Sequence, residues 1–160
     1  TRAQVLLGEL GELGDRFAPL ADLLTRVARH PAGNRAFAET VTGLDTRYET
    51  LPDTGHPWQG RLAPDLTLTT DSGRRRLTEL LAPGRGVLVD LTGGTAVRAT
   101  AAGWADRVDT VTATCPDHPD LRADLRAVLL RPDGHTAWVR GADGRLEGLV
   151  GALRHWFGDV

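Results

Sequence analysis

The sequence predicts an α/β domain with a mixed sheet covered by helices, preceded by an N-terminal helical hairpin. Two observations lead to this prediction. After about residue 65, short apolar β runs alternate with helical patterns, which is typical of strands paired in parallel through helical crossovers. Near the C-terminus, the stretch AVLLRPDGHTAWV (127–139) places two apolar runs around a turn, and this adds an antiparallel hairpin.

Residues 1–50 are predicted to form a helical linker segment. Apolar residues recur at helical spacing from Pro19 to Arg29, and a second amphipathic helix follows from about Ala32 to Leu44 after a break at His30-Pro31. A first short helix is expected to end near Glu9, because each glycine in this stretch costs about 1 kcal/mol relative to alanine in a helix. These glycines are Gly8, Gly11 and Gly14; no strand precedes them, so they do not form a dinucleotide-binding loop.

The stretch LPDTGHPWQGRLAPD (51–65) is rich in proline and glycine. This composition is typical of a connection between domains, so residues 51–64 are predicted to form a surface linker and residues 65–160 the α/β domain. Within that domain the expected order is a strand (66–69), a turn at Gly73, a helix (75–81), a strand (86–91), a helix (96–104) and a strand (108–114). An irregular stretch, the hairpin at 127–139 and a final helix (145–156) complete it.

The hairpin turn Arg131-Pro132-Asp133-Gly134 is expected to be of type I, because proline presets φ at its second position and glycine suits its exit. The first strand of the hairpin is continuously apolar, whereas the second is mixed and is expected to be the more exposed one. His135 and Trp138 follow the turn. We interpret both as strand side chains with their polar tips in water, so that the hairpin closes the edge of the sheet.

Composition excludes several classes of protein. Hydrophobic residues make up 41% of the 160 positions, and no apolar run approaches the roughly 20 residues that a membrane-spanning helix needs. The net charge of −2, with arginines and acids interspersed, provides no basic face for nucleic acid. The single cysteine, Cys115, rules out an intrachain disulfide and a thiolate zinc site, so we expect a cytoplasmic protein. From the apolar runs and the charge distribution we expect no membrane partner and no nucleic-acid partner.

The order of two strand–helix units, a strand, a hairpin and a last helix resembles the thioredoxin-like fold. Several stretches also look like the C-terminal part of class A FAD-dependent aromatic monooxygenases, a family that includes polyketide, phenol and rifampicin hydroxylases. These stretches are HPAGNRAFAETVTGLDTRY (30–48), HPWQGRLAPDLTL (56–68), RLTELLAPGRGVLVDL (76–91), WADRV (104–108) and VLLRPDGHTAWV (128–139). The resemblance covers nearly the whole chain.

The resemblance implies that this chain is the C-terminal domain of a longer monooxygenase. Its start at Thr1, without a methionine, fits that expectation. The partners would be the flavin and substrate domains of the parent polypeptide, or a second copy of the chain, with residues 1–50 joining the domains. FAD and NAD(P)H would belong to the parent, and we expect no catalytic, cofactor-binding or metal-binding residue in this chain.

A working thioredoxin would carry a C-x-x-C motif after the strand at 86–91, because a helix N-terminus lowers the thiol pKa. The sequence there is LTGGTAVRA (91–99), and no proline directly precedes Ala127, so dithiol exchange is excluded at this position. The turn from Asp90 to Thr95 is interpreted as a tight turn with Thr95 as the helix N-cap. An anion at the start of that helix is the alternative reading.

The stretch CPDHPD (115–120) brings Cys115, Asp117, His118 and Asp120 together in sequence. Its two prolines favour an extended exposed loop, and a second pair of ligands at helical or hairpin spacing is lacking, so we expect no metal site.

Two other functions stay open. The second function, after the monooxygenase domain, is a stand-alone interaction or dimerisation module that uses the apolar helix faces at 19–44. The third is a small enzyme working through His135 or Cys115. The aromatic substrate lies beyond what these residues determine.

Overall fold

The computed structural model describes residues 18–50, 53–118 and 121–160, and the chain forms two compact units, Thr1–Thr46 and Arg47–Val160. The described part of the first unit holds two helices, α2 (Ala18–Ala28) and α3 (Pro31–Thr42). Pro31 lies in the first turn of α3, where its missing amide costs no hydrogen bond. The predicted pair of helices broken at His30-Pro31 is confirmed, while the helix expected near Glu9 lies outside the described residues.

Neither α2 nor α3 buries a side chain in the described part of the chain. The two helices approach each other closely at Gly33, where a Cβ would lie 2.2 Å from the carbonyl oxygen of Val27. Five large apolar side chains of this unit are between 38% and 48% exposed: Leu20, Leu23, Val27, Val41 and Leu44. The described part of the first unit therefore presents apolar side chains without a buried core.

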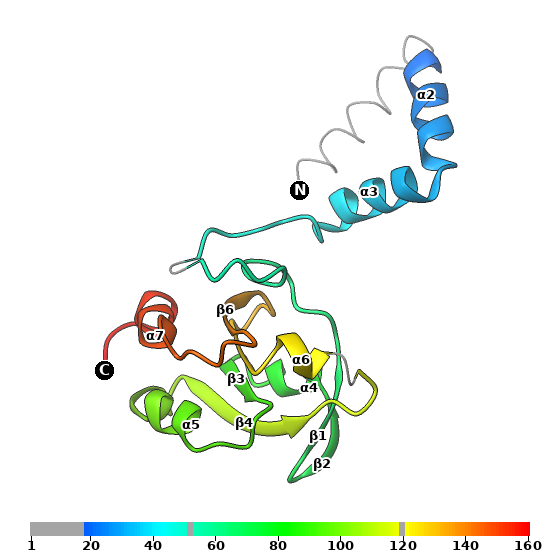
Figure 1. The fold of residues 1–160 in the computed structure, drawn as a ribbon. Coiled ribbons are helices and arrows are strands. Elements are labelled where there is room, and N and C mark those ends of the chain that lie inside the picture. Colours follow the sequence, from blue (N-terminus) through cyan, green and yellow to red (C-terminus); the bar gives the residue numbers. More distant parts are fainter. Residues whose placement is uncertain (1–17, 51–52, 119–120) are drawn as a thin grey trace. The chain divides into compact units, whose positions relative to one another are not determined.

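The second unit is built on one mixed sheet with the strand order β2-β1-β4-β3-β5-β6 (Figure 1). The strands are β1 (Thr67–Thr70), β2 (Gly73–Arg76), β3 (Gly86–Asp90), β4 (Val108–Thr114), β5 (Ala127–Leu130) and β6 (Thr136–Arg140). β3 and β4 pair in parallel, and every other neighbouring pair is antiparallel. The predicted α/β mixed sheet is confirmed, and the path from β3 to the last helix is consistent with a thioredoxin-like fold.

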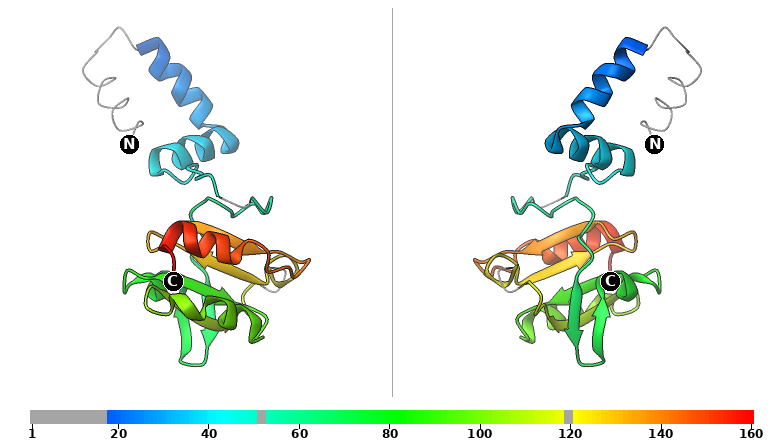
Figure 2. Two further views of the ribbon diagram at one scale, coloured as in Figure 1. Left: turned by 90° about the vertical axis from the view of Figure 1, so that its left-hand side faces the viewer. Right: turned by 90° about the vertical axis from the view of Figure 1, so that its right-hand side faces the viewer.

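Five helical segments accompany the sheet in the described residues: α4 (Leu77–Leu81), α5 (Ala96–Ala101), the 3-10 turn η2 (Ala102–Trp104), α6 (Leu121–Asp124) and α7 (Leu149–Phe157). α5 and α7 lie on the same face of the sheet, as the left view of Figure 2 shows. No helix in the described part of the chain is long and apolar enough to span a membrane.

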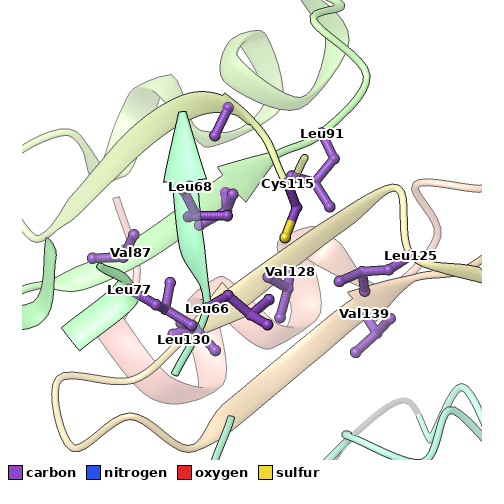
Figure 3. Close-up of a cluster of buried hydrophobic side chains, with 12 residues drawn as sticks. Leu66, Leu68, Leu77, Val87, Leu91, Cys115, Leu125, Val128, Leu130 and Val139 are labelled. Carbon is purple, nitrogen blue, oxygen red and sulfur yellow. The ribbon is translucent and has the colours of Figure 1, made fainter. Parts of the chain in front are cut away.

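The core consists of two apolar clusters, one on each face of the sheet. Alternation along β3 separates them, because successive strand side chains point to opposite faces: Val87 and Val89 belong to one cluster and Leu88 to the other. The first cluster gathers side chains from β1, α4 and β5 around Cys115, whose sulfur points into it (Figure 3). The second is formed with α5, η2 and α7.

Three elements differ from the sequence-based expectation. The residues after Gly73 form β2, antiparallel to β1, so the helix expected from Arg75 begins only at Leu77. Pairing with β1 overrides the helical preference of these arginines, because tertiary contacts outweigh weak propensities. The short helix α6 lies in the stretch expected to be irregular. The last helix begins at Leu149 instead of Arg145, since Gly144 and Gly148 adopt positive φ angles of 68° and 81°.

Residues 47–63, which we call the strap, are part of the second unit and pair with β6. The Gly60 amide donates to the Thr136 carbonyl (2.9 Å), and the Thr136 amide donates to the carbonyl of Arg61 (2.8 Å). β6 is consequently covered, and four of its five residues are buried. The expectation that this strand is the more exposed one is wrong, because the strap covers it. The expectation that the hairpin closes the sheet edge is confirmed, since β6 is the last strand of the sheet.

Gln59 is the centre of the strap, although residues 51–64 look like a surface linker in the sequence. Its side chain is fully buried and donates from Nε2 to the Thr50 hydroxyl (2.7 Å). Its Oε1 accepts the Thr54 amide (2.9 Å), and the Tyr48 amide donates to the Gly60 carbonyl (2.8 Å). These bonds give the described part of the strap an ordered loop structure.

Candidate functional site

The β5–β6 turn is closed by a hydrogen bond from the Gly134 amide to the Arg131 carbonyl (2.9 Å). Gly134 has φ 83°, a backbone conformation that favours glycine. Asp133 Oδ1 accepts the His135 amide (3.1 Å), and Asp133 Oδ2 pairs with Arg131. Burial alone would raise the pKa of the Asp133 carboxyl, but the His135 amide and the Arg131 guanidinium together keep that pKa below its ordinary value.

His135 lies between this turn and the strap, and its side chain is only 16% exposed. Its ring meets the Tyr48 ring edge-on, with 4.8 Å between centroids, and its Nδ1 is 3.4 Å from Asp133 Oδ1. Neither ring nitrogen has a hydrogen-bond partner among the described residues. The interpretation of His135 as a strand residue with its polar tip in water is wrong in one respect, because the strap covers that tip.

Trp138 is fully buried in the cluster on the α7 face. Its indole Nε1 donates to the Glu147 carbonyl (3.0 Å), so its one polar atom is satisfied inside the protein. The expected polar tip in water is wrong here too, but the structural interpretation of Trp138 agrees with this packing.

An arginine clasp formed by Tyr48, Arg131 and Trp156 joins the strap to the body of the second unit. The Arg131 guanidinium carbon lies 4.5 Å from the Tyr48 ring centroid and 4.2 Å from that of Trp156. A cation over two aromatic faces is attracted by both ring quadrupoles. Sequence reasoning missed this clasp, because Tyr48 is 83 residues from Arg131 in sequence numbering and no local pattern links them.

The CPDHPD stretch does not gather its polar side chains into one site. Cys115 is buried, with its thiol 3.6 Å from the Thr67 carbonyl, and burial raises the pKa of this thiol. Asp117 forms an ion pair with Arg74 (2.9 Å), His118 is exposed, and Asp120 lies outside the described residues. The described part of the chain contains no cluster of three or more metal-ligating side chains.

The turn after β3 is organised by Asp90. Its Oδ1 accepts the Thr92 amide (2.9 Å) and the Thr92 hydroxyl (2.6 Å), and Asp90 as a whole is 1% exposed. Thr95 occupies the N-cap position of α5, as expected. Its side chain, however, makes no capping hydrogen bond. The tight-turn interpretation agrees with this local bonding.

A hollow of about 630 Å³ in the second unit lies between residues 53–58 of the strap and residues 141–147. Trp58, Leu121 and Val139 contribute apolar side chains to its lining. The charged lining residues are four acids and one base: Asp53, Asp124, Asp143, Glu147 and Arg145. Sequence analysis assigned Trp58 to a linker and missed this hollow; an aromatic residue inside a proline- and glycine-rich stretch is the signal that could have found it.

His56 lines the same hollow, and its ring meets the Trp58 ring edge-on with 6.0 Å between centroids. Burial lowers the pKa of His56, and the nearby Asp124 carboxylate counteracts this only in part. His56 is therefore mainly uncharged at neutral pH. His135 and Cys115, the two residues considered for a small enzyme, and Asp90 of the turn after β3 each contact different partners and form no shared constellation in the described residues.

The geometry defines the second unit as an α/β domain with a mixed sheet, a strap over its last strand and no paired cysteines. Residues 56–159 match the family model described as "Aromatic-ring hydroxylase, C-terminal", and the chain belongs to this family. The family prediction from the sequence is confirmed.

Curated relatives agree with this assignment. The chain is 38% identical over 159 residues to a 12-dehydrotetracycline 5-monooxygenase/anhydrotetracycline 6-monooxygenase of Streptomyces rimosus, covering 99% of this chain and 31% of the relative. It is 39% identical to a rifampicin monooxygenase of Streptomyces venezuelae (78% and 22% coverage) and 36% identical to a dialkyldecalin synthase of Streptomyces rugosporus (99% and 28%). The chain thus spans about a third or less of the length of these relatives.

Solved structures show the same fold. The anhydrotetracycline hydroxylase OxyS of Streptomyces rimosus matches with a TM-score of 0.81 at 37% identity, over 99% of this chain and 32% of that protein. CabE, an aromatic hydroxylase from angucycline biosynthesis, matches with a TM-score of 0.78 at 44% identity, over 92% and 30%. PieE, a flavin-dependent monooxygenase determined with FAD and substrate, has a TM-score of 0.53 at 21% identity over 86% and 31%, and shows the fold alone.

Proposed function

We propose that this chain is the C-terminal region of a flavin-dependent monooxygenase that hydroxylates an aromatic, polyketide-type substrate with NAD(P)H and oxygen. The observation that carries this proposal is the match to the tetracycline-type monooxygenase, which covers 99% of this chain but only 31% of the relative. An aromatic hydroxylase from angucycline biosynthesis, which is similar in sequence and fold, supports the same class of substrate.

In this proposal, FAD, NAD(P)H and the substrate bind to the remainder of the parent polypeptide, and residues 1–160 have a non-catalytic role. The burial of Cys115 and His135 within separate packing environments supports that role, because a nucleophile or a general base must reach a substrate. The location we propose is the cytoplasm, where a lone thiol remains reduced.

The proposed partner is the flavin and substrate domains of the parent. The four exposed large apolar side chains of α2 and α3, together with Leu44 after the end of α3, support this partner, because exposed apolar surface on a protein marks an interaction site. A homodimer that uses the same side chains is the second partner to test.

The same exposed apolar side chains favour one alternative function, a stand-alone thioredoxin-like interaction or dimerisation module without enzymatic activity. The genomic sequence upstream of Thr1 separates the two functions. An open reading frame that continues upstream into a G-x-G-x-x-G domain supports the monooxygenase, whereas a start codon directly before Thr1 supports the module.

The decisive experiment uses the intact gene product. We expect it to purify with bound flavin, to oxidise NAD(P)H, and to add one oxygen atom to members of a panel of polycyclic phenols, as measured by mass spectrometry. A flavin-free protein would contradict the proposed cofactor. One relative is a dialkyldecalin synthase and not a monooxygenase, so the mass of the product is the test. A product with the same mass as its substrate would contradict hydroxylation.

A further inference from the structure

We propose that the hollow between the strap and the β6–α7 loop is a docking groove for an extended, arginine- or lysine-bearing segment of another protein. The groove is defined by residues 53–58 on one side and 141–147 on the other, with α6 at one end. Its volume of about 630 Å³ lies in the range of ligand sites.

The floor of the groove is apolar and includes one aromatic ring. Val139 is buried, and Trp58 and Leu121 are half-buried and pack against the core cluster of Figure 3. The indole face is the aromatic surface to which cations bind best. The aliphatic stem of an arginine or lysine would contact such a floor while its charged end reaches the rim.

The rim is acidic, and two of its carboxylates have no basic partner among the described side chains. Asp53 pairs with Arg47 (3.3 Å), and Asp143 lies 3.8 Å from Arg145. Within the described residues, Asp124 and Glu147 have no basic side chain within ion-pair distance. Their charge, together with the apolar floor, favours a cationic occupant, because complementary charges promote encounter and set specificity.

The exposure of the walls points to a peptide instead of an enclosed small molecule. Asp53, Pro57, Asp143 and Glu147 are all exposed, so the groove does not surround its occupant as a small-molecule pocket does. A second copy of the chain is a poor occupant through its most arginine-rich strand, β2. The arginines of that strand already pair with carboxylates of their own chain: Arg74 with Asp117, Arg75 with Glu79 and Arg76 with Asp65.

The test titrates residues 1–160 with a capped hexapeptide of alternating arginine and alanine, and with its glutamate–alanine counterpart. Binding is followed by calorimetry and by NMR shifts of the Trp58 indole and the amides of residues 53–58 and 141–147. We expect only the basic peptide to bind, with an affinity that falls as salt is added. The double variant Asp124→Asn/Glu147→Gln should bind about tenfold more weakly, which corresponds to about 1.4 kcal/mol.

The matched control is Asp22→Asn/Asp71→Asn, which removes the same charge from exposed positions outside the groove. This control should bind like the wild type, and both variants should retain its melting temperature. Equal losses in both variants would overturn the proposal, since binding would then follow net charge alone.

Three further outcomes would also overturn it. The first is that a single arginine amide binds as tightly as the hexapeptide, which would indicate a small-molecule site. The second is a dimer of residues 1–160 that Asp124→Asn/Glu147→Gln dissociates, which would make a second copy the occupant. The third is an intact parent that cannot bind the peptide although residues 1–160 do, which would assign the groove to the parent's own chain. None of these readouts involves flavin or turnover, so they are independent of the proposed monooxygenase activity.

Discussion

Trp138 and His135 lie three residues apart along the β5–β6 hairpin, but their side chains have different environments. Trp138 is enclosed by the α7 face of the core and uses its only donor on the Glu147 carbonyl. His135 is covered by the strap and has two ring nitrogens without hydrogen-bond partners among the described residues. Full burial of a large satisfied ring stabilises a fold, whereas buried unpaired polar atoms oppose part of the gain from packing.

We therefore expect Trp138→Ala to lower the free energy of unfolding by about 3–5 kcal/mol, and His135→Ala to lower it by about 1 kcal/mol or less. Denaturant unfolding followed by circular dichroism measures both. Trp138→Phe is the matched variant, because it keeps a ring and loses the bond to Glu147, and its cost should be intermediate. A His135→Ala variant as unstable as Trp138→Ala would contradict this assignment.

A second residue-scale prediction concerns Cys115. Burial raises the pKa of its thiol, so the folded protein disfavours the thiolate that reacts with thiol reagents. The thiol should resist alkylation at neutral pH in the native protein and react at once in denaturant. Rapid alkylation of the native protein, at the rate of a free thiol, would show that the thiol is accessible.

The same shift has a consequence for stability. Because the unfolded chain loses the thiol proton at a lower pH than the folded protein, the free energy of unfolding should fall as pH rises above the ordinary thiol pKa. Below that pH both states keep the proton, and the effect is absent. Cys115→Ala should remove this part of the pH dependence, and an unchanged slope in the variant would assign it to other groups.

At the scale of elements, the strap depends on a close backbone approach at Gly60. Gly60 has φ 76°, and a Cβ there would lie 2.1 Å from the Tyr48 carbonyl oxygen. Gly55 has nearly the same angle, φ 73°, but no atom within 4 Å of its Cβ position. Gly55→Ala should thus cost only the left-handed conformation, about 1 kcal/mol, while Gly60→Ala should cost clearly more. Thermal unfolding of the two variants measures the difference, and equal costs would mean that the strap yields without strain.

The arginine clasp gives a second prediction at this scale. Arg131→Ala removes the cation from between Tyr48 and Trp156, so the strap should open more often while the sheet persists. We expect the Gly60 and Thr136 amides, which bond across the strap, to exchange hydrogen about tenfold faster. Arg145→Ala is the control, because Arg145 is 70% exposed and contacts neither ring. Unchanged exchange in Arg131→Ala would show that backbone pairing alone fixes the strap.

At the scale of the whole molecule, the two units differ in their capacity to fold alone. Every residue of both core clusters lies in the second unit, between Trp58 and Phe157. The helices of the first unit are 11 and 12 residues long and bury nothing among the described residues. Isolated helices of this length are marginal in water.

Residues 47–160 should therefore fold by themselves and unfold cooperatively at nearly the melting temperature of residues 1–160. Residues 1–46 alone should show weak helical circular dichroism. Differential scanning calorimetry of the two fragments checks this, and loss of cooperative unfolding in residues 47–160 would mean that the first unit contributes to the core.

Several features could be predicted from local sequence. The continuous apolar run of Val87, Leu88 and Val89 is typical of a strand buried on both faces, and the helix break at His30-Pro31 follows from the geometry of proline. The turn before His135 also follows from local chemistry, since Asp133 and Gly134 suit its positions. Of the candidate site, the sequence indicated a tight turn at Asp90, and the local bonding agrees with that reading. It also placed Cys115 in an exposed loop, and the burial of this residue contradicts that expectation.

The sequence by itself determined the class of fold, the order of its main strands and its family, because periodicity, turn residues and motif spacing are properties of neighbouring residues. Only the tertiary structure decided the β1–β2 hairpin, the burial of His135, the clasp around Arg131 and the groove beside Trp58. The last three of these depend on contacts between segments far apart in the chain, whereas the β1–β2 hairpin is local and is joined to the rest of the sheet by the pairing of β1 with β4. The proline- and glycine-rich strap looks like a linker in the sequence, because no local sequence pattern indicates the backbone hydrogen bonds that it forms with β6.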